Sequence, residues 1–477
     1  YNGSNAITQT VYNGIPYSKL AVTNGSGSGR APKITTGPLT VNSIININAL
    51  ADLTLGILGS SNCTVSSAGP LNVLSTGGLY CNANVISGAG AFSLGNFSFL
   101  GIGHAQGISL LGSATGNVQM TASRTFNTTG NYIYNGLVTQ ITGNGLSTTC
   151  NDLTIDNPTS VTIATNQLVN GINLLKQGTF DIGSTKITIN GTGILNSTGG
   201  LMKANVGIVE MKGTSGTAQG LAGSWFVGRN ISTLINANST GITIAATLND
   251  TLLISSALLY GSVTNSAITT NDNLTLLSRD SATARFGEIV TGSGNSINGK
   301  ANIERYMQAK KSWRLLATPI SIGTSPTVTN AWRESGLSLA STGYGTQITG
   351  PASFLGMDNY TQRASMKYYS SAINNFVDVT NTNTTTLANT KGYFIFVRGD
   401  RAVLRIKGNI ISGSQTFPVS AMKFESFGNP FPSRIDFRTI TKTNIANSFI
   451  AWNPNSAGLY NVGAYETYIY NGTDYVK

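Results

Sequence analysis

Few residues of this 477-residue sequence could support catalysis. His104 is the only histidine, which excludes a metal site built from several histidines and a Ser–His pair elsewhere in the chain. The segment Gly101-Ile-Gly-His104 predicts a turn between two repeats. Asp152 and Asp156 form the closest pair among the seven acids of residues 1–275, and on a strand they share one face. Glycoside hydrolysis needs paired carboxylates, but a solvated outer face is the simpler interpretation.

The cysteines offer no metal site. Cys63, Cys81 and Cys150 lack zinc-ligand spacing, and their odd number prevents complete internal pairing. We expect small buried hydrophobic side chains, with a Cys63–Cys81 disulfide between neighbouring repeats as the alternative. Because acids are scarce and no Cys or His stands at ligand spacing, the sequence predicts a fold without metal ions or other cofactors.

The composition indicates a folded chain with little charge. Hydrophobic residues make up 40% and charged residues 10%, with 56 glycines. Disorder requires low hydrophobicity and high net charge, while abundant Asn, Thr and Ser favour turns over helices. No apolar run reaches the roughly 18 residues of a membrane-spanning helix. Since the chain begins at Tyr1 without a Met or a signal peptide, we expect a mature or truncated piece of a longer protein.

Short apolar alternations fill the first 275 residues. Examples are Val161-Thr-Ile163, Phe180-Asp-Ile182 and Ile187-Thr-Ile189, with later ones at Ile242-Thr-Ile244 and Leu274-Thr-Leu276. This period of two predicts strands with one buried face. Such a long series of very short, nearly uncharged strands favours a parallel β-solenoid, in which inward residues form an aliphatic column and outward Asn, Thr and Ser form ladders.

The composition changes between residues 275 and 310. Aromatic residues rise from 14 in residues 1–275 to 25 in the remainder, and the net charge rises from +2 to +9. The cations are interspersed with acids, so we expect a solvated surface and no nucleic-acid partner. Longer strands at Tyr393–Val397, Val403–Ile406 and Tyr465–Tyr470 predict an antiparallel β-sandwich. The predicted domains are a stalk at 1–290 and a sandwich-like domain at 291–477, truncated at its C-terminal end.

Several segments of the second half recur together, in one order, in a known class of protein. They are Ile303-Glu-Arg-Tyr306, Trp313-Arg-Leu-Leu316, Lys391-Gly-Tyr-Phe-Ile-Phe-Val-Arg-Gly-Asp-Arg401, Phe427-Gly-Asn-Pro-Phe-Pro-Ser-Arg-Ile-Asp436 and Trp452-Asn-Pro454. Residues 300–460 thereby resemble the region that precedes the sorting domain in large surface proteins exported by the bacterial type IX secretion system. The first half is similar to the stalks of those proteins.

The resemblance implies an extracellular protein at the outer surface of a Gram-negative bacterium. Its partners would be the type IX machinery during export, then surface glycans or neighbouring copies of itself. Adhesion, biofilm formation and gliding are the expected roles, without enzymatic activity. A glycan-binding module that uses aromatic platforms and a carbohydrate-active β-helix enzyme remain alternatives.

Two further predictions concern short segments. Asp250-Thr-Leu252 and Asp280-Ser-Ala282 resemble the acceptor triplet for O-glycosylation in exported proteins of such bacteria, which makes Thr251 and Ser281 candidate glycosylation sites. The segment Arg398-Gly-Asp-Arg401 predicts a hairpin turn between the two strands that flank it.

Overall fold

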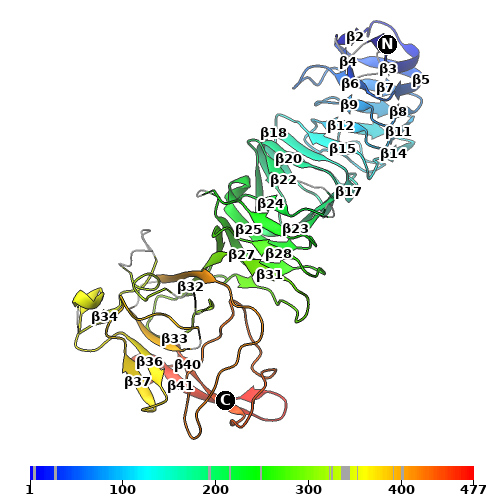
Figure 1. The fold of residues 1–477 in the computed structure, drawn as a ribbon. Helices are drawn as coiled ribbons and strands as arrows, with labels where there is room; N and C mark the ends of the chain where they lie inside the picture. The colour runs from blue at the N-terminus through cyan, green and yellow to red at the C-terminus, as the bar shows by residue number, and fades with distance from the viewer. Residues whose placement is uncertain are drawn as a thin grey trace. The chain divides into compact units, whose positions relative to one another are not determined.

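The computed structural model describes the chain except residues 4–6, 26–28, 192–194, 214–215, 248–249, 322, 324–325, 335–343, 352, 390 and 399–401. The fold is nearly all β, with a parallel solenoid of about 13 turns and antiparallel sheets elsewhere (Figure 1), which confirms the predicted fold class. The contacts divide it into two compact units, residues 1–243 with 261–266 and residues 244–260 with 267–477. No helix among the described residues is long and apolar enough to cross a membrane.

In the first unit, successive coils of the solenoid stack through parallel strands. One row comprises β2 (Gln9–Val11), β4 (Ala31–Thr35), β6 (Ala51–Leu55), β9 (Gly78–Tyr80), β12 (Phe99–Ile102), β15 (Asn131–Tyr134), β18 (Leu153–Thr162), β20 (Asn173–Asp181) and β22 (Leu195–Ser197). A second row comprises β1 (Asn2–Gly3), β3 (Tyr17–Asn24), β5 (Leu39–Ile47), β7 (Val65–Ser67), β8 (Leu71–Val73), β10 (Ile86–Gly88), β11 (Ala91–Leu94), β13 (Val118–Met120) and β14 (Ser123–Thr125). The remaining strands are β16 (Gln140–Ile141), β17 (Thr149–Cys150), β19 (Gln167–Val169), β21 (Lys186–Gly191), β23 (Leu201–Gly213), β24 (Gln219–Leu221), β25 (Phe226–Asn236) and β26 (Ile242–Ile244).

The core of this unit is a continuous column of apolar side chains. Leu53, Leu79, Leu100, Tyr132 and Leu153 are register partners on successive strands, and each is 0% exposed. No coil could bury these side chains alone, so each coil is stabilised by its neighbours.

Hydrogen-bonded asparagine pairs join neighbouring coils of the solenoid. The Asn72 Nδ2 donates to Asn46 Oδ1 at 3.0 Å, and the Asn190 Nδ2 donates to Asn170 Oδ1 at 2.9 Å. Each bond is a single pair that joins two neighbouring coils without charge, which is one step of the ladders expected from the sequence.

Glycine is required where coils approach most closely at a corner. A Cβ at Gly69 would lie 1.3 Å from the carbonyl oxygen of Ser43 on the preceding coil, and a Cβ at Gly90 would lie 1.8 Å from that of Gly69. Part of the high glycine content therefore follows from backbone packing between coils.

The second unit begins with parallel strands and continues with antiparallel sheets. Its first strands are β27 (Leu252–Tyr260), β28 (Ala267–Thr269), β29 (Leu274–Leu276), β30 (Arg285–Phe286), β31 (Ser296–Asn298) and β32 (Lys300–Met307). The later ones are β33 (Lys311–Leu316), β34 (Thr349–Gly350), β35 (Asn359–Tyr360), β36 (Met366–Ser370), β37 (Asn375–Asp378), β38 (Tyr393–Arg398), β39 (Ala402–Asn409), β40 (Ser448–Asn453), β41 (Ala464–Tyr470) and β42 (Tyr475–Val476). The strand β32 pairs in parallel with β29 and antiparallel with β39.

Aromatic side chains join two antiparallel sheets of this unit, β33-β38-β36-β37 and β40-β41-β42. The Phe394 ring lies 4.9 Å from the Trp452 ring, which lies 4.8 Å from Tyr465. The Trp452 indole N–H donates to the carbonyl oxygen of Trp313 at 2.8 Å. Some of the extra aromatic residues of the second half therefore pack where these two sheets meet, although Tyr465 stays 54% exposed.

Among the described residues, the strands on either side of the predicted hairpin at residues 398–401 do not pair with each other. Although β38 and β39 lie where strands were expected, β38 pairs with β33 and β36, whereas β39 pairs with β32. These two strands therefore belong to different sheets, and residues 399–401, on which the predicted turn falls, lie outside the described part of the chain.

Candidate binding site

The acidic pair singled out from the sequence lies on the outward side of the solenoid. Asp152 Oδ1 accepts the backbone N–H of Ile172 at 2.8 Å. Asp156 accepts hydrogen bonds from Lys176 Nζ at 3.2 Å and Gln177 Nε2 at 3.0 Å. Each carboxylate is therefore bound to the next coil, a contact that holds coils together.

The histidine and the cysteines also have structural surroundings. His104 lies in a turn after β12, as predicted, where its Nδ1 accepts the backbone N–H of Gln106 at 3.1 Å and desolvation lowers its pKa. Cys63, Cys81 and Cys150 are buried with free thiols, so the alternative disulfide does not form. Within the described ranges, no group of three or more His, Cys, Asp or Glu side chains could hold a metal ion.

A pocket of about 660 Å³ lies in the second unit, and we call it the arginine pocket. Three of the segments that carry the sequence resemblance contribute to its lining, through residues 303–305, 315–316 and 427–434. These segments are more than a hundred residues apart at the extremes, yet they form one cavity. Three arginines, Arg285, Arg305 and Arg434, belong to its lining.

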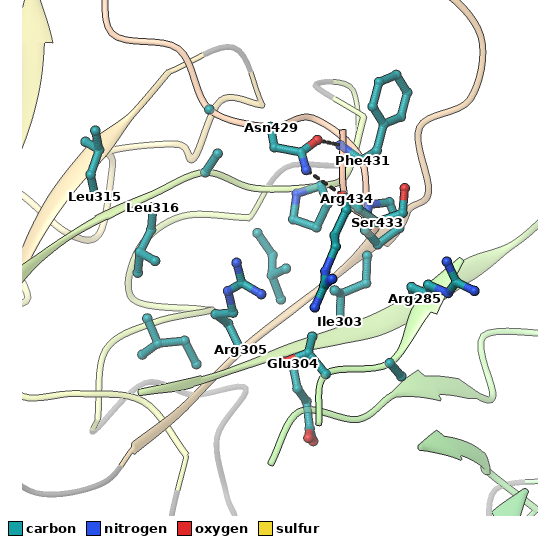
Figure 2. Close-up of a pocket in the computed structure, with 18 of the residues that line it drawn as sticks. Arg285, Ile303, Glu304, Arg305, Leu315, Leu316, Asn429, Phe431, Ser433 and Arg434 are labelled. Carbon is teal, nitrogen blue, oxygen red and sulfur yellow. Dashed lines mark hydrogen bonds between the residues drawn. The ribbon is translucent and has the colours of Figure 1, made fainter. Parts of the chain in front are cut away.

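The arginine side chains of this pocket have no counter-ion. Among the described residues, no carboxylate lies within ion-pair distance of Arg285, Arg305 or Arg434, and their guanidinium groups make no hydrogen bond. Figure 2 shows Arg305 and Arg434 extending into the space between β32 and the loop 427–434, whereas Arg285 extends away from them.

The loop 427–434 is held in a defined conformation. Asn429 accepts the Phe431 N–H at 3.0 Å and donates to the Ser433 carbonyl oxygen at 2.5 Å (Figure 2). The Phe286 N–H on β30 donates to the Pro432 carbonyl oxygen at 3.0 Å. A Cβ at Gly428 would lie 1.7 Å from the Cβ of Ala317, so only glycine permits this close approach. The motif thereby positions Arg434.

Successive side chains of β32 point to opposite faces of its sheet, and the two faces have different surroundings. Ile303 and Arg305 share one face with Ile406 and Leu404, their partners on β39. This face forms part of the pocket lining, where burial among protein atoms lowers the pKa of Arg305 although its side chain still reaches solvent. A cation over an apolar floor favours an anion as ligand.

Glu304 lies on the opposite face of β32, where its carboxylate forms ion pairs and a hydrogen bond with other residues. Its carboxylate, 0% exposed, contacts Arg279 Nη1 and Arg405 Nη2 at 2.6 Å each and accepts the Ser278 N–H at 3.2 Å. Figure 2 shows its side chain extending away from Arg305. The nearest carboxylate is therefore not available to neutralise the pocket.

The two candidate glycosylation sites differ in accessibility. Ser281 is exposed at the tip of a tight turn, closed by the Arg279 N–H donating to the Ala282 carbonyl oxygen at 2.8 Å. Thr251 is half-buried directly before β27. If native protein carries an O-glycan, we expect peptide mapping to find it at Ser281 in preference to Thr251. A glycan at Thr251 with unmodified Ser281 would contradict this order.

The sequence interpretation missed the arginine pocket because its cations are scattered among acids along the chain. Spacing could not reveal which acids have partners already. The feature of the sequence that could have indicated the pocket is the fixed order of the aromatic and proline-rich segments, since segments that recur together can lie close together in the fold. Comparisons with protein families, with curated proteins and with solved structures find no match for this chain.

Proposed function

We propose that this chain is an extracellular structural and adhesive protein, displayed on or released from the outer surface of a Gram-negative bacterium after type IX export. It acts by multivalent contact and without turnover. The resemblance of residues 300–460 supports the export route and the location. The exposed surface of the solenoid loops supports adhesion.

Large apolar side chains on two of these loops carry the adhesive proposal. Ile57 and Leu58 follow β6 and are 73% and 55% exposed, while Leu137 and Val138 follow β15 and are 48% and 56% exposed. The loops are neighbours, because a Cβ at Gly59 would lie 3.0 Å from Leu137 Cδ1. We call these four side chains the apolar loop cluster. Exposed apolar groups that gather in this way are typical of contact surfaces.

A solenoid with few charges suits repeated weak attachment. Many modest contacts, along one chain or among neighbouring copies, add through effective concentration. Catalysis instead needs titratable groups held together in a perturbed environment, and Asp152 and Asp156 are each bound to the next coil.

Replacement of the apolar loop cluster tests the adhesive proposal. We expect the fourfold variant Ile57→Ser, Leu58→Ser, Leu137→Ser and Val138→Ser to bind alkyl-coated beads about tenfold more weakly, since burial of one such side chain is worth about 1.5–3 kcal/mol. The control Ile440→Ser with Ile445→Ser removes two exposed apolar side chains from the second unit and should leave adsorption unchanged.

Two further observations bear on the same proposal. A deletion strain should lose surface attachment or spreading, and the fourfold variant should fail to restore it. Equal adsorption of all variants would remove the case for the apolar loop cluster. Release of reducing ends or unsaturated sugars from a polysaccharide panel by the pure protein would overturn action without turnover.

The arginine pocket favours a second candidate function, which is glycan binding. Two arginines without counter-ions extend into a cavity of about 660 Å³, a volume within the usual range for small ligands. Aromatic and proline side chains of its lining, Phe427, Phe431 and Pro432, offer apolar surface for sugar rings.

A further inference from the structure

A second hollow of about 340 Å³ adjoins the arginine pocket. The two share Thr283, Arg305, Leu315 and Leu316 in their linings. We call them together the arginine groove. Arg305 therefore lies where the two hollows meet, with Arg434 in the lining of the first and Arg314 in that of the second.

Arg314 is a buried cation without a carboxylate partner. Its residue is 9% exposed, its Nε has no hydrogen-bond partner, and its Nη2 reaches only the Gln308 carbonyl oxygen, at 3.5 Å. Desolvation lowers its pKa. Because a buried charge without a counter-ion is destabilising, this side chain favours an anion in the adjoining hollow.

The other charged groups of the groove do not supply that anion. Glu304 is bound to Arg279 and Arg405 on the far face of β32. Asp280 lines the second hollow from the exposed turn that carries Ser281, and no ion pair joins it to Arg305 or Arg314 among the described residues. The two linings contain five arginines, at 279, 285, 305, 314 and 434, against the carboxylates of Asp280 and Glu304, so the groove is net cationic.

We propose that the arginine groove binds an acidic saccharide, whose carboxylate or sulfate groups are held by Arg305, Arg314 and Arg434. The planar guanidinium group matches both oxyanions through paired N–H donors. Two adjoining hollows suit an extended ligand that carries more than one anionic group. Apolar lining from Pro432, Phe427 and Trp452 suits the C–H faces of sugar rings. This proposal rests on the glycan-binding candidate function and names its ligand class.

Calorimetric titration of the full chain near 0.15 M salt tests the groove. The probes are a galacturonate oligosaccharide, a heparin-derived sulfated oligosaccharide, a neutral dextran oligosaccharide of matched length, inorganic sulfate and a single-stranded oligonucleotide. We expect at least one acidic oligosaccharide to bind, and the carboxylated and sulfated probes identify which oxyanion is preferred. The neutral oligosaccharide should not bind measurably.

Charge-removing variants assign the binding to the groove. We expect Arg305→Gln and Arg434→Gln each to weaken acidic oligosaccharide binding by about tenfold or more. Arg363→Gln removes an exposed cation of the same unit outside the groove, and the variant should bind as the parent does. Because Arg314 is buried, Arg314→Gln could also change the stability of the fold, so its thermal unfolding is measured as well. The exposed residues Arg305 and Arg434 decide the result.

Three results would overturn the proposal. One is equal binding of acidic oligosaccharide by the parent, Arg305→Gln and Arg434→Gln. Another is equal binding of neutral and acidic oligosaccharides, which would support glycan binding in general but contradict a preference for acidic saccharides. The third is tighter binding of the oligonucleotide with the same arginine dependence. Adsorption to alkyl-coated beads is measured in parallel, so that failure of the groove is distinguished from failure of the apolar loop cluster.

Discussion

Replacing Glu304 with alanine should lower the free energy of unfolding of the second unit by about 3–5 kcal/mol. The substitution leaves Arg279 and Arg405 without their shared carboxylate and removes the acceptor of the Ser278 N–H. Because the carboxylate is 0% exposed, water does not replace these contacts without rearrangement. Differential scanning calorimetry would show the loss as a lower unfolding temperature of the transition that belongs to this unit.

An exposed ion pair of the same unit provides the control. Asp436 contacts Arg438 at 2.7 Å, and both side chains are more than 40% exposed. Asp436→Ala should leave the unfolding temperature unchanged within error, since exposed pairs add little. A Glu304→Ala protein as stable as Asp436→Ala would show that the carboxylate does not hold β32, β39 and the Arg279 turn together.

Asn173→Leu should raise the stability of the first unit by about 1–3 kcal/mol, the cost of leaving a buried polar group unsatisfied. Asn173 lies in the apolar column between its register partners Leu153 and Leu195 and is 0% exposed. Neither its Oδ1 nor its Nδ2 has a hydrogen-bond partner among the described residues. Leucine continues the column, and chemical denaturation followed by far-ultraviolet circular dichroism would measure the gain.

The same replacement at Asn131 should have the opposite sign. This amide is 4% exposed, but it donates to the Phe97 carbonyl oxygen at 2.9 Å and accepts from Asn151 Nδ2 at 2.8 Å. Asn131→Leu leaves those groups unpaired and should cost about 1–3 kcal/mol. Equal effects of the two substitutions would show that burial alone, and not pairing, determines their stability.

Much of the fold could be predicted because, in a strand with one buried face, every second side chain is buried and apolar. The alternations at Ile187–Ile189 and Leu274–Leu276 coincide with β21 and β29. The separate alternations Ile172-Asn-Leu174 and Phe180-Asp-Ile182 overlap the two ends of one longer strand, β20 (Asn173–Asp181), whose register with β18 shifts along its length. At Ile172-Asn-Leu174 the alternation predicted the wrong inward side, because Ile172 is 45% exposed while Asn173 is 0% exposed and points inward. Periodicity alone therefore does not fix which side chains a strand buries.

The sequence did not predict which strands of the second unit pair with one another. The strands at 393–398 and 402–409 are close in the chain, which favours a hairpin, but they join separate sheets. The same limitation applies to the arginine groove. Arg305 and Arg434 are distant in sequence, and only the fold shows that Glu304, beside Arg305, points the other way.

The register of the column has a consequence for how the first unit can fold. Leu79 pairs with Leu100, Leu100 with Tyr132 and Leu153 with Asn173, so partners lie 21, 32 and 20 residues apart. These separations do not grow with the number of coils, so loop-closure entropy is lost once per coil, in similar amounts. A chain that emerges end first from a pore can therefore add finished coils to a growing stack, and lengthening such a chain need not slow its folding.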